Sequence, residues 1–141
     1  NEVLYYSDIV FIHWECDENI EIILKQIQQS GKKAGIAICM STVPEKIEQQ
    51  LKNVDAVLLL TIPEPGRSGQ KFDMDGLVYI DQLNSMPFRK NFRICVDGGI
   101  NNKIAPQLQV ENIVSGSSVL NHKDPKSQIL CLQTAGRYEA N

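Results

Sequence analysis

The sequence lacks long apolar runs, basic clusters and closely spaced cysteines, and each absence excludes a class of protein. No apolar run approaches the ~20 residues that a membrane-spanning helix requires, and the first residues show no signal-peptide pattern. The 14 lysines and arginines are scattered among 17 acidic residues, and the net charge of −3 argues against a nucleic-acid surface. We therefore expect a cytoplasmic protein that binds neither a membrane nor a nucleic acid.

The cysteines are few and far apart, and no C-x-x-C pair occurs, which argues against a disulfide framework in a chain of this length. The four are Cys16, Cys39, Cys95 and Cys131. Three of them lie in or beside apolar runs. We expect buried, reduced thiols.

A length of 141 residues suits one domain with a substantial core, and we expect a single domain over residues 1–141. No linker or low-complexity segment interrupts the chain. The residues after Gly136 are polar, and we expect a frayed tail there.

Short apolar runs alternate with segments of helical periodicity. Five runs are typical of strands, over residues 9–12, 34–38, 56–60, 93–96 and 113–114. Helical patterns cover residues 20–27, 42–51, 77–83 and 125–132, and a short helical segment begins after residue 102. Thr42 is the expected cap of the second helix, with Pro44 in its first turn and Glu45 as the capping-box acid. Five strand–helix units predict an α/β fold with a parallel sheet, in part of a barrel or in an open doubly wound sheet.

Two of the apolar runs end in residues that suit phosphate-handling (β/α) barrels. One ends in Asp97, Gly98 and Gly99, and the next leads into Gly116 and Ser117. Such barrels place catalytic groups at the carboxyl ends of the strands and a phosphate site after strands seven and eight. The carboxylate suits acid–base or metal chemistry, and the small residues let backbone N–H groups approach an anion. A helix cap at Asp97 and a simple turn at Gly116 are the structural alternatives.

The longest connection, residues 61–75, follows the most apolar strand. It contains Gly66, Arg67, Ser68 and Gly69, and its two glycines permit a segment that closes over a ligand and presents N–H donors. An ordinary surface turn is the alternative. The functional interpretation becomes specific only when this loop is taken together with the two strand ends that follow it in order.

His13 and Glu15 come at the end of the first strand, and their spacing places them on the same side of a strand. A metal or acid–base pair is one interpretation, and a hydrogen-bonded structural histidine is the commoner one. His122 lies in a polar loop, far from His13, so the two histidines form no metal motif.

The chain resembles the carboxyl-terminal half to two-thirds of the ribulose-phosphate 3-epimerases. The segments that carry the resemblance are 8–15, 31–37, 54–58, 65–72, 96–100 and 114–117. The resemblance implies strands four to eight of a TIM (β/α)8 barrel, about five βα units. A whole barrel needs ~200 to 250 residues, and the chain starts at Asn1 rather than Met. We therefore expect a piece, or a processed or truncated form, of a longer protein.

The family interconverts D-ribulose 5-phosphate and D-xylulose 5-phosphate by removing and returning the proton next to the carbonyl. Two aspartates act from opposite faces of the substrate, and a divalent cation (Zn, Fe, Mn or Co) stabilises the enediolate. The resemblance implies that Asp97 is one acid–base aspartate and a metal ligand. The second aspartate and the histidine ligands belong to strands upstream of Asn1. The expected partner is a phosphorylated ketose, and this chain alone should be inactive.

The resemblance also implies where the substrate binds. Gly98 and Gly99 would line the substrate, and Gly116 and Ser117 would hold its phosphate. The closing loop would consist of Gly66, Arg67, Ser68 and Gly69. An isolated five-stranded sheet has an open edge, so we expect it to pair with another copy, aggregate or fold poorly.

Several positions depart from the usual pattern of the family. Cys39 and Met40 stand where Asn-Pro is usual, and Leu60 replaces a methionine. The loop is about one residue longer before Pro65, and an aromatic residue and a glycine are replaced by Arg67 and Ser68. Arg67 either adds a phosphate contact or marks a different sugar.

Two other functions remain open at this stage. A non-catalytic homologue would keep the phosphate site and lose turnover. Another phosphate-binding barrel enzyme, such as those of aromatic amino-acid or thiamine synthesis, would rely on different upstream residues and not on the Asp97 metal role.

Overall fold

The chain folds into a five-stranded parallel sheet with helices between the strands. The computed structural model describes residues 5–135, so the tail expected after Gly136 lies outside the described residues. The strands are β1 (Ile9–His13), β2 (Lys33–Cys39), β3 (Ala56–Leu60), β4 (Arg93–Asp97) and β5 (Asn112–Val114). Their order in the sheet is the order in the sequence, β1-β2-β3-β4-β5, and every pair is parallel. A doubly wound sheet reverses its strand order, so the sequential order supports the barrel interpretation.

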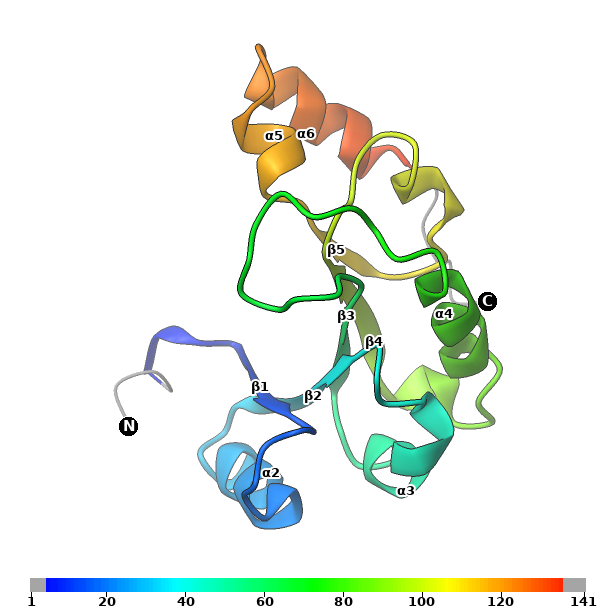
Figure 1. Ribbon diagram of the computed structural model, residues 1–141. Coiled ribbons are helices and arrows are strands. Elements are labelled where there is room, and N and C mark those ends of the chain that lie inside the picture. The colour runs from blue at the N-terminus through cyan, green and yellow to red at the C-terminus, as the bar shows by residue number, and fades with distance from the viewer. Residues whose placement is uncertain (1–4, 136–141) are drawn as a thin grey trace.

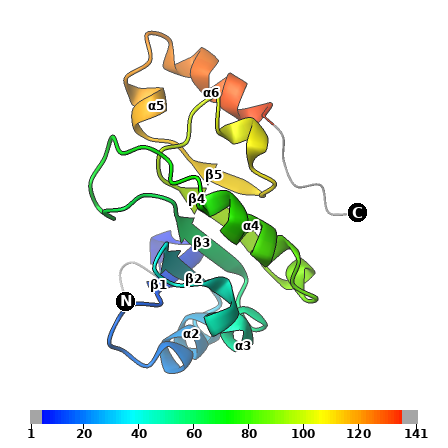
Figure 2. The ribbon, with the colours of Figure 1, turned by 45° about the vertical axis from the view of Figure 1, so that its right-hand side comes forward.

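Helices and 3₁₀ turns fill the connections. They are α2 (Ile20–Gln29), η1 (Pro44–Ile47), α3 (Glu48–Leu51), α4 (Gly76–Asn84), η2 (Arg89–Asn91), η3 (Ala105–Gln107), α5 (Ser117–Leu120) and α6 (Pro125–Gln133). Figure 1 shows the curved sheet with α2 and α3 at one end and α5 and α6 at the other. In Figure 2, α4 lies alongside β3 and β4. Within the described part of the chain, no helix is long and apolar enough to cross a membrane.

The two faces of the sheet differ in burial. Along β4, Ile94 and Val96 are fully buried in the core, whereas Cys95 and Asp97 on the opposite face are half-buried. Since side chains alternate along a strand, one face packs against the helices and the other carries Asp97. The register pairs Asp97 with Leu60 on one side and Val114 on the other, so these three side chains share the second face.

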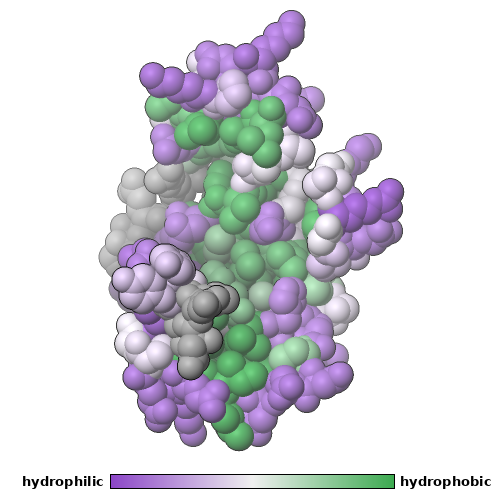
Figure 3. Space-filling view, turned by 90° about the vertical axis from the view of Figure 1, so that its left-hand side faces the viewer, coloured by the Kyte–Doolittle hydropathy of each residue, from purple (hydrophilic) through white to green (hydrophobic). Residues whose placement is uncertain are grey.

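Each outer strand has a neighbour on one side only among the described residues. β1 pairs with β2 alone and β5 pairs with β4 alone. No residue of β1 is fully buried. Figure 3, which faces the side on which β1 lies in Figure 1, shows apolar side chains through the middle of this surface with polar ones around them. This arrangement matches five consecutive strands of a barrel that is not closed within the described residues.

One local expectation needs correction. Thr42 does not cap the second helix: η1 begins after Val43, whose side chain makes no capping bond, and the Thr42 hydroxyl donates to Glu15 Oε1 at 2.6 Å instead. After β5, residues 117–120 form α5, a single helical turn that follows Gly116.

The cysteines are less buried than expected. All four are free; Cys16, Cys39 and Cys95 are half-buried, and Cys131 is exposed. Two of them are half-buried because of the sheet face on which they lie. Cys39 and Cys95 alternate with the fully buried Ile38 and Ile94, so their side chains point away from the helices.

A buried arginine joins β4 to the segment before β5. Arg89 is 4% exposed, and its Nη2 donates to both carboxylate oxygens of Glu111 at 2.8 Å. Its Nε and Nη1 donate to Asn84 and to the carbonyl of Phe92. Glu111 Oε2 also accepts from the Ile94 N–H at 2.8 Å. The Glu111 carboxylate therefore neutralises the buried guanidinium and accepts a hydrogen bond from a strand N–H at the same time.

Substitution Glu111→Gln should lower the free energy of unfolding by about 3 kcal/mol, because it leaves a buried guanidinium without its counter-charge. Denaturant unfolding followed by circular dichroism measures the effect. The matched control is Glu64→Gln, which breaks an ion pair to Arg67 whose side chains are 64% and 73% exposed. That control should change stability by less than about 0.5 kcal/mol. Equal effects of the two variants would contradict the assigned role of Arg89.

Candidate functional site

Asp97 is the last residue of β4, at the carboxyl end of the sheet. It lines a cavity of about 100 Å³ together with residues from two other segments of the chain. The sequence-predicted residues that line this cavity are Arg67, Ser68, Gly69, Asp97, Gly98, Gly99, Gly116 and Ser117. Gly66 is the one predicted site residue that does not line it. The loop and the two strand ends therefore meet at one place, as expected from their order in the sequence.

A larger cavity of about 620 Å³ adjoins the first. The two share Gly69, Gly99 and Ser117, and the second extends past Phe72 and Ser118. Figure 1 shows the loop of residues 61–75, in green, arching beside α5. The combined space lies between this loop and the start of α5, with Asp97 at one end.

Thr61 fixes the backbone of the Asp97 turn, and sequence reasoning missed it. Its side chain is fully buried. The Thr61 N–H donates to the Asp97 carbonyl at 2.8 Å, and its hydroxyl donates to the Gly98 carbonyl at 2.9 Å. One feature of the sequence could have indicated this role. Thr61 is a hydroxyl residue that directly follows the apolar strand β3, whose last residue, Leu60, pairs with Asp97.

The two glycines after Asp97 are required by geometry. Gly98 and Gly99 have φ of +123° and +68°, a region that L residues with a side chain rarely adopt. A Cβ on Gly99 would lie 2.0 Å from the Phe72 N atom. The end of the long loop thus packs directly on the Asp97 turn, and only glycine fits between them.

The long loop is held by its own side chains. Gln70 Nε2 donates to the carbonyls of Glu64 and Arg67, each at 2.6 Å, and Gln70 Oε1 accepts from the Glu64 N–H at 3.1 Å. Arg67 pairs with Glu64 at 3.0 Å and is 73% exposed. Gln70 therefore closes the loop into a compact arch that leaves Arg67 and Ser68 on the cavity.

The turn after β5 offers backbone donors. Gly116 precedes α5 and Ser117 begins it. Their N–H groups donate no hydrogen bond to another described residue. Ser115, one residue earlier, is tied back to the carbonyl of Ile100 through its hydroxyl at 2.9 Å. This bond anchors the turn to the segment that follows Asp97.

The electrostatics favour a proton-transfer role for the carboxyl and not for the neighbouring thiol. Burial raises the pKa of Asp97 above its ordinary value, and no described residue hydrogen-bonds to or pairs with its carboxylate. A raised pKa moves a carboxyl toward the range in which it exchanges protons efficiently. Burial, and then the charge of Asp97, raises the pKa of the Cys95 thiol to about 11, so this thiol stays protonated at neutral pH.

His13 and Glu15 do lie together, as their spacing predicted. His13 Nδ1 is 3.5 Å from Glu15 Oε2, at the carboxyl end of β1. His122 lies elsewhere, and its Nδ1 contacts the backbone of Asp124. No residue of the His13–Glu15 pair lines the Asp97 cavity.

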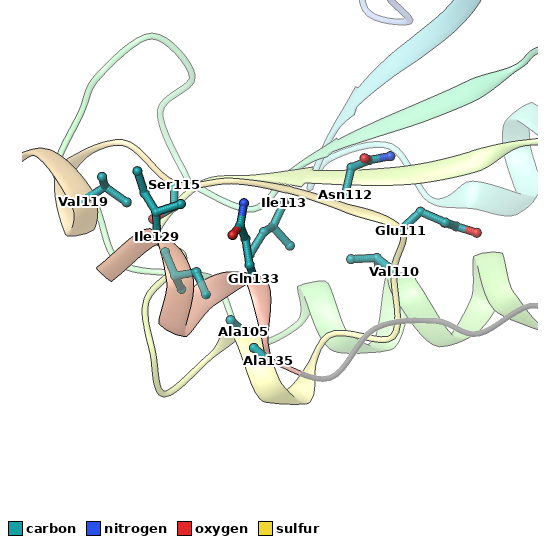
Figure 4. Close-up of a pocket in the computed structure, with 11 residues that line it drawn as sticks. Ala105, Val110, Glu111, Asn112, Ile113, Ser115, Val119, Ile129, Gln133 and Ala135 are labelled. Carbon is teal, nitrogen blue, oxygen red and sulfur yellow. The ribbon is translucent and has the colours of Figure 1, made fainter. Parts of the chain in front are cut away.

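A third cavity, of about 310 Å³, lies between β5 and the helices and has a different character. Figure 4 shows its lining from β5, η3, α5 and α6, which is largely aliphatic. Glu111 is the one titratable residue of this lining, and its carboxylate is engaged by Arg89. The residues predicted from the sequence as a catalytic and phosphate site line the Asp97 cavity and not this one, apart from Gly66, which lines neither.

A parallel sheet in sequential order, with an acidic residue and small residues gathered at its carboxyl edge, is typical of part of a TIM-type (β/α) barrel. The crystal structure of 3-hexulose-6-phosphate synthase from Salmonella typhimurium matches this fold with a TM-score of 0.69. The match has 18% sequence identity and covers 92% of this chain and 62% of that one. It supports the α/β barrel class predicted from the sequence.

The chain belongs to the ribulose-phosphate 3 epimerase family, whose model matches residues 4–120. The ribulose-phosphate 3-epimerase of Bacillus subtilis is 33% identical over 129 residues, which are 87% of this chain and 59% of that protein. The protein of the same name from Methanocaldococcus jannaschii is 33% identical over 133 residues, 91% of this chain and 56% of that protein. The chain thus spans a little under three-fifths of the length of these relatives.

Proposed function

We propose that this chain forms the carboxyl-terminal part of a metal-dependent sugar-phosphate 3-epimerase. Its substrate class is a phosphorylated ketose such as D-ribulose 5-phosphate, converted to its epimer D-xylulose 5-phosphate. Family membership supports the reaction class, and the cavity that Asp97 shares with Gly116 and Ser117 supports the sites. The cytoplasm is the expected location of such a metabolic enzyme.

Asp97 is the proposed acid–base residue. It removes or returns the proton on the carbon next to the carbonyl from one face of the sugar. Its half-buried position raises its pKa, so the carboxylate is a stronger base than an exposed aspartate. The turn formed by the two glycines and held by Thr61 fixes the position of the carboxylate at the end of β4.

The remaining cavity residues bind and orient the substrate. The N–H groups of Gly116 and Ser117 are the proposed donors to the phosphate, since no other described residue uses them. Gly98 and Gly99 form the floor beside the sugar. The loop with Gly66, Arg67, Ser68 and Gly69 is the proposed cover of the substrate, and all of these residues except Gly66 line the cavity. Arg67 is exposed and can move its guanidinium onto the phosphate.

The Asp97 carboxylate also suits a metal ligand. It lines an open cavity and has no protein partner among the described residues, and oxygen donors of this kind hold divalent cations. A bound cation would supply positive charge beside the oxygen that becomes negative when the proton leaves. The other ligands would come from barrel strands that precede this chain.

The observation that carries the proposal is the shared cavity. One small molecule that reaches both Asp97 and the amides after β5 must carry an anionic group for the amides and a reacting carbon near the carboxylate. A phosphorylated ketose has this shape. A homologue that binds the sugar without turnover would use the same amides and would not need the Asp97 carboxylate.

The 141-residue chain alone should show no epimerase turnover with added divalent cation, because it spans less than three-fifths of its relatives and we place the second aspartate and the other metal ligands in the remainder. The unpaired edges of β1 and β5 also favour association with another copy over an enclosed site. A coupled assay of xylulose 5-phosphate formation measures turnover.

The matched experiment is an eight-stranded chimera in which the amino-terminal strands of the Bacillus subtilis relative precede this chain. The chimera should gain turnover, and the chain alone should not. Clear activity of the chain alone would contradict the incomplete-site prediction. A folded chimera that binds the sugar phosphate without turnover would favour the non-catalytic homologue.

A further inference from the structure

A second group of metal-ligating side chains lies at the carboxyl ends of β1 and β2. His13 ends β1, Cys39 ends β2, and Glu15 follows His13 by two residues. One ligand atom from each of the three lies within 4.8 Å of the other two. The pairing of the strands continues past β1 through the Trp14 N–H, which donates to the Ala37 carbonyl at 2.8 Å. This bond keeps Glu15 directed across to β2.

Glu15 is held in one orientation by β2 and the segment after it. Its Oε1 accepts from the Cys39 N–H at 2.9 Å and from the Thr42 hydroxyl at 2.6 Å. These two bonds leave Oε2 directed at His13 Nδ1, 3.5 Å away. Bonds of this kind to the distal oxygen are how proteins orient a metal-binding carboxylate.

The spacing of His13 and Glu15 fits two ligands of one tetrahedral ion. A nitrogen and an oxygen that bind one zinc ion at about 2.0–2.1 Å lie roughly 3.3–3.4 Å apart, close to the observed 3.5 Å. The widest separation in the group, up to 4.8 Å, is about 1 Å longer than a tetrahedral edge to sulfur. Binding of one ion by all three groups therefore requires their side chains to move closer together.

We propose that His13, Glu15 and Cys39 form a binding site for a zinc-like divalent cation. A nitrogen, a carboxylate oxygen and a thiolate together favour Zn²⁺ or Co²⁺ over Mg²⁺ or Ca²⁺, which prefer oxygen alone. Three protein ligands leave one position of the ion for water or a small ligand. The side chains of His13 and Glu15 are 50% and 30% exposed, so the ion has a path from solvent.

This site goes beyond the proposed epimerase function and does not depend on it. Cys39 pairs in register with Leu60, and Leu60 pairs with Asp97, so two strand spacings, about 9–10 Å, separate the Cys39 and Asp97 backbones. None of the three ligands lines the Asp97 cavity. A test can therefore remove either site and observe the other.

The test is a Co²⁺ titration of the purified protein under reducing conditions, using the folded fraction from size-exclusion chromatography. Co²⁺ should produce the near-ultraviolet thiolate charge-transfer band and the visible bands of a tetrahedral ion, and Zn²⁺ should displace them. Cys39→Ser should abolish the thiolate band, and His13→Gln should weaken Co²⁺ binding at least ~10-fold. Cys95→Ser and Asp97→Asn should retain the band.

A second pair of variants tests the orientation of Glu15. Thr42→Val removes the hydroxyl that holds Oε1 and should weaken Co²⁺ binding by ~10- to 100-fold, whereas Thr42→Ser keeps the hydroxyl and should bind as the parent does. Circular dichroism confirms that each variant is folded. Absence of a thiolate band in the folded parent protein, or its persistence in Cys39→Ser, would overturn the proposal. Its loss in Asp97→Asn would assign the bound ion to the epimerase site and overturn it as well.

Discussion

Asp97→Asn should reduce epimerase turnover of the eight-stranded chimera by about 10³- to 10⁴-fold, and with it the exchange of the substrate's carbon-three proton with solvent. An amide of the same shape can neither take up this proton nor supply the negative charge that a cation requires, and general acid–base catalysis contributes ~10²–10⁴ by itself. Incorporation of solvent deuterium into the ketose phosphate, followed by proton NMR, measures the exchange directly.

The matched control is Asp55→Asn, at the opposite end of the same sheet. Asp55 precedes β3, and its Oδ2 accepts from the Ala34 N–H at 2.8 Å, a bond that an asparagine oxygen can preserve. This variant should keep turnover within about threefold of the parent. Deuterium exchange that persists in folded Asp97→Asn would remove Asp97 from the proposed chemistry.

Gly99→Ala should lower the free energy of unfolding of the chain by about 3 kcal/mol or more. A Cβ at this position would lie 2.0 Å from Phe72 N and 2.6 Å from the Lys71 carbonyl carbon, and both are backbone atoms that cannot turn aside. The positive φ of +68° adds strain of ~1 kcal/mol or more. The loop end at residues 71–72 must move away from the Asp97 turn, so the cavity opens and sugar-phosphate binding weakens too.

Gly116→Ala is the control for this effect. Its φ is −90°, and an added Cβ there meets nothing within 4 Å. Urea unfolding should give Gly116→Ala a stability within ~0.5 kcal/mol of the parent. Similar unfolding of Gly99→Ala and Gly116→Ala would show that the loop does not rest on the Asp97 turn as described.

The parallel sheet and the meeting of the site segments follow from patterns that are local in the sequence. Each strand is a short apolar run, and each pairs with the strand that precedes or follows it in the chain. The carboxyl ends of parallel strands share one edge, so Asp97 and Gly116 had to come close once the strands were assigned. The roles of these residues stay predictions, because the chain spans less than three-fifths of the length of the relatives from which the roles are inferred.

The wrong cap and the partners that sequence reasoning missed have a common physical cause, which is hydrogen bonding between distant segments. Thr42 has the sequence context of a helix cap, yet the carboxylate of Glu15, 27 positions away, takes its hydroxyl. The pairing of Arg89 with Glu111 and the support that Thr61 gives to Asp97 are also long-range. Periodicity and spacing report on neighbours in the chain, and they contain no information about such partners.

A crystal structure of the eight-stranded chimera with an unreactive analogue of ribulose 5-phosphate tests the central claim most directly. The account predicts the phosphate within hydrogen-bonding distance of the Gly116 and Ser117 N–H groups, with the carbon next to the carbonyl facing the Asp97 carboxylate. A phosphate bound away from these amides, or a sugar that leaves Asp97 in solvent, would contradict it.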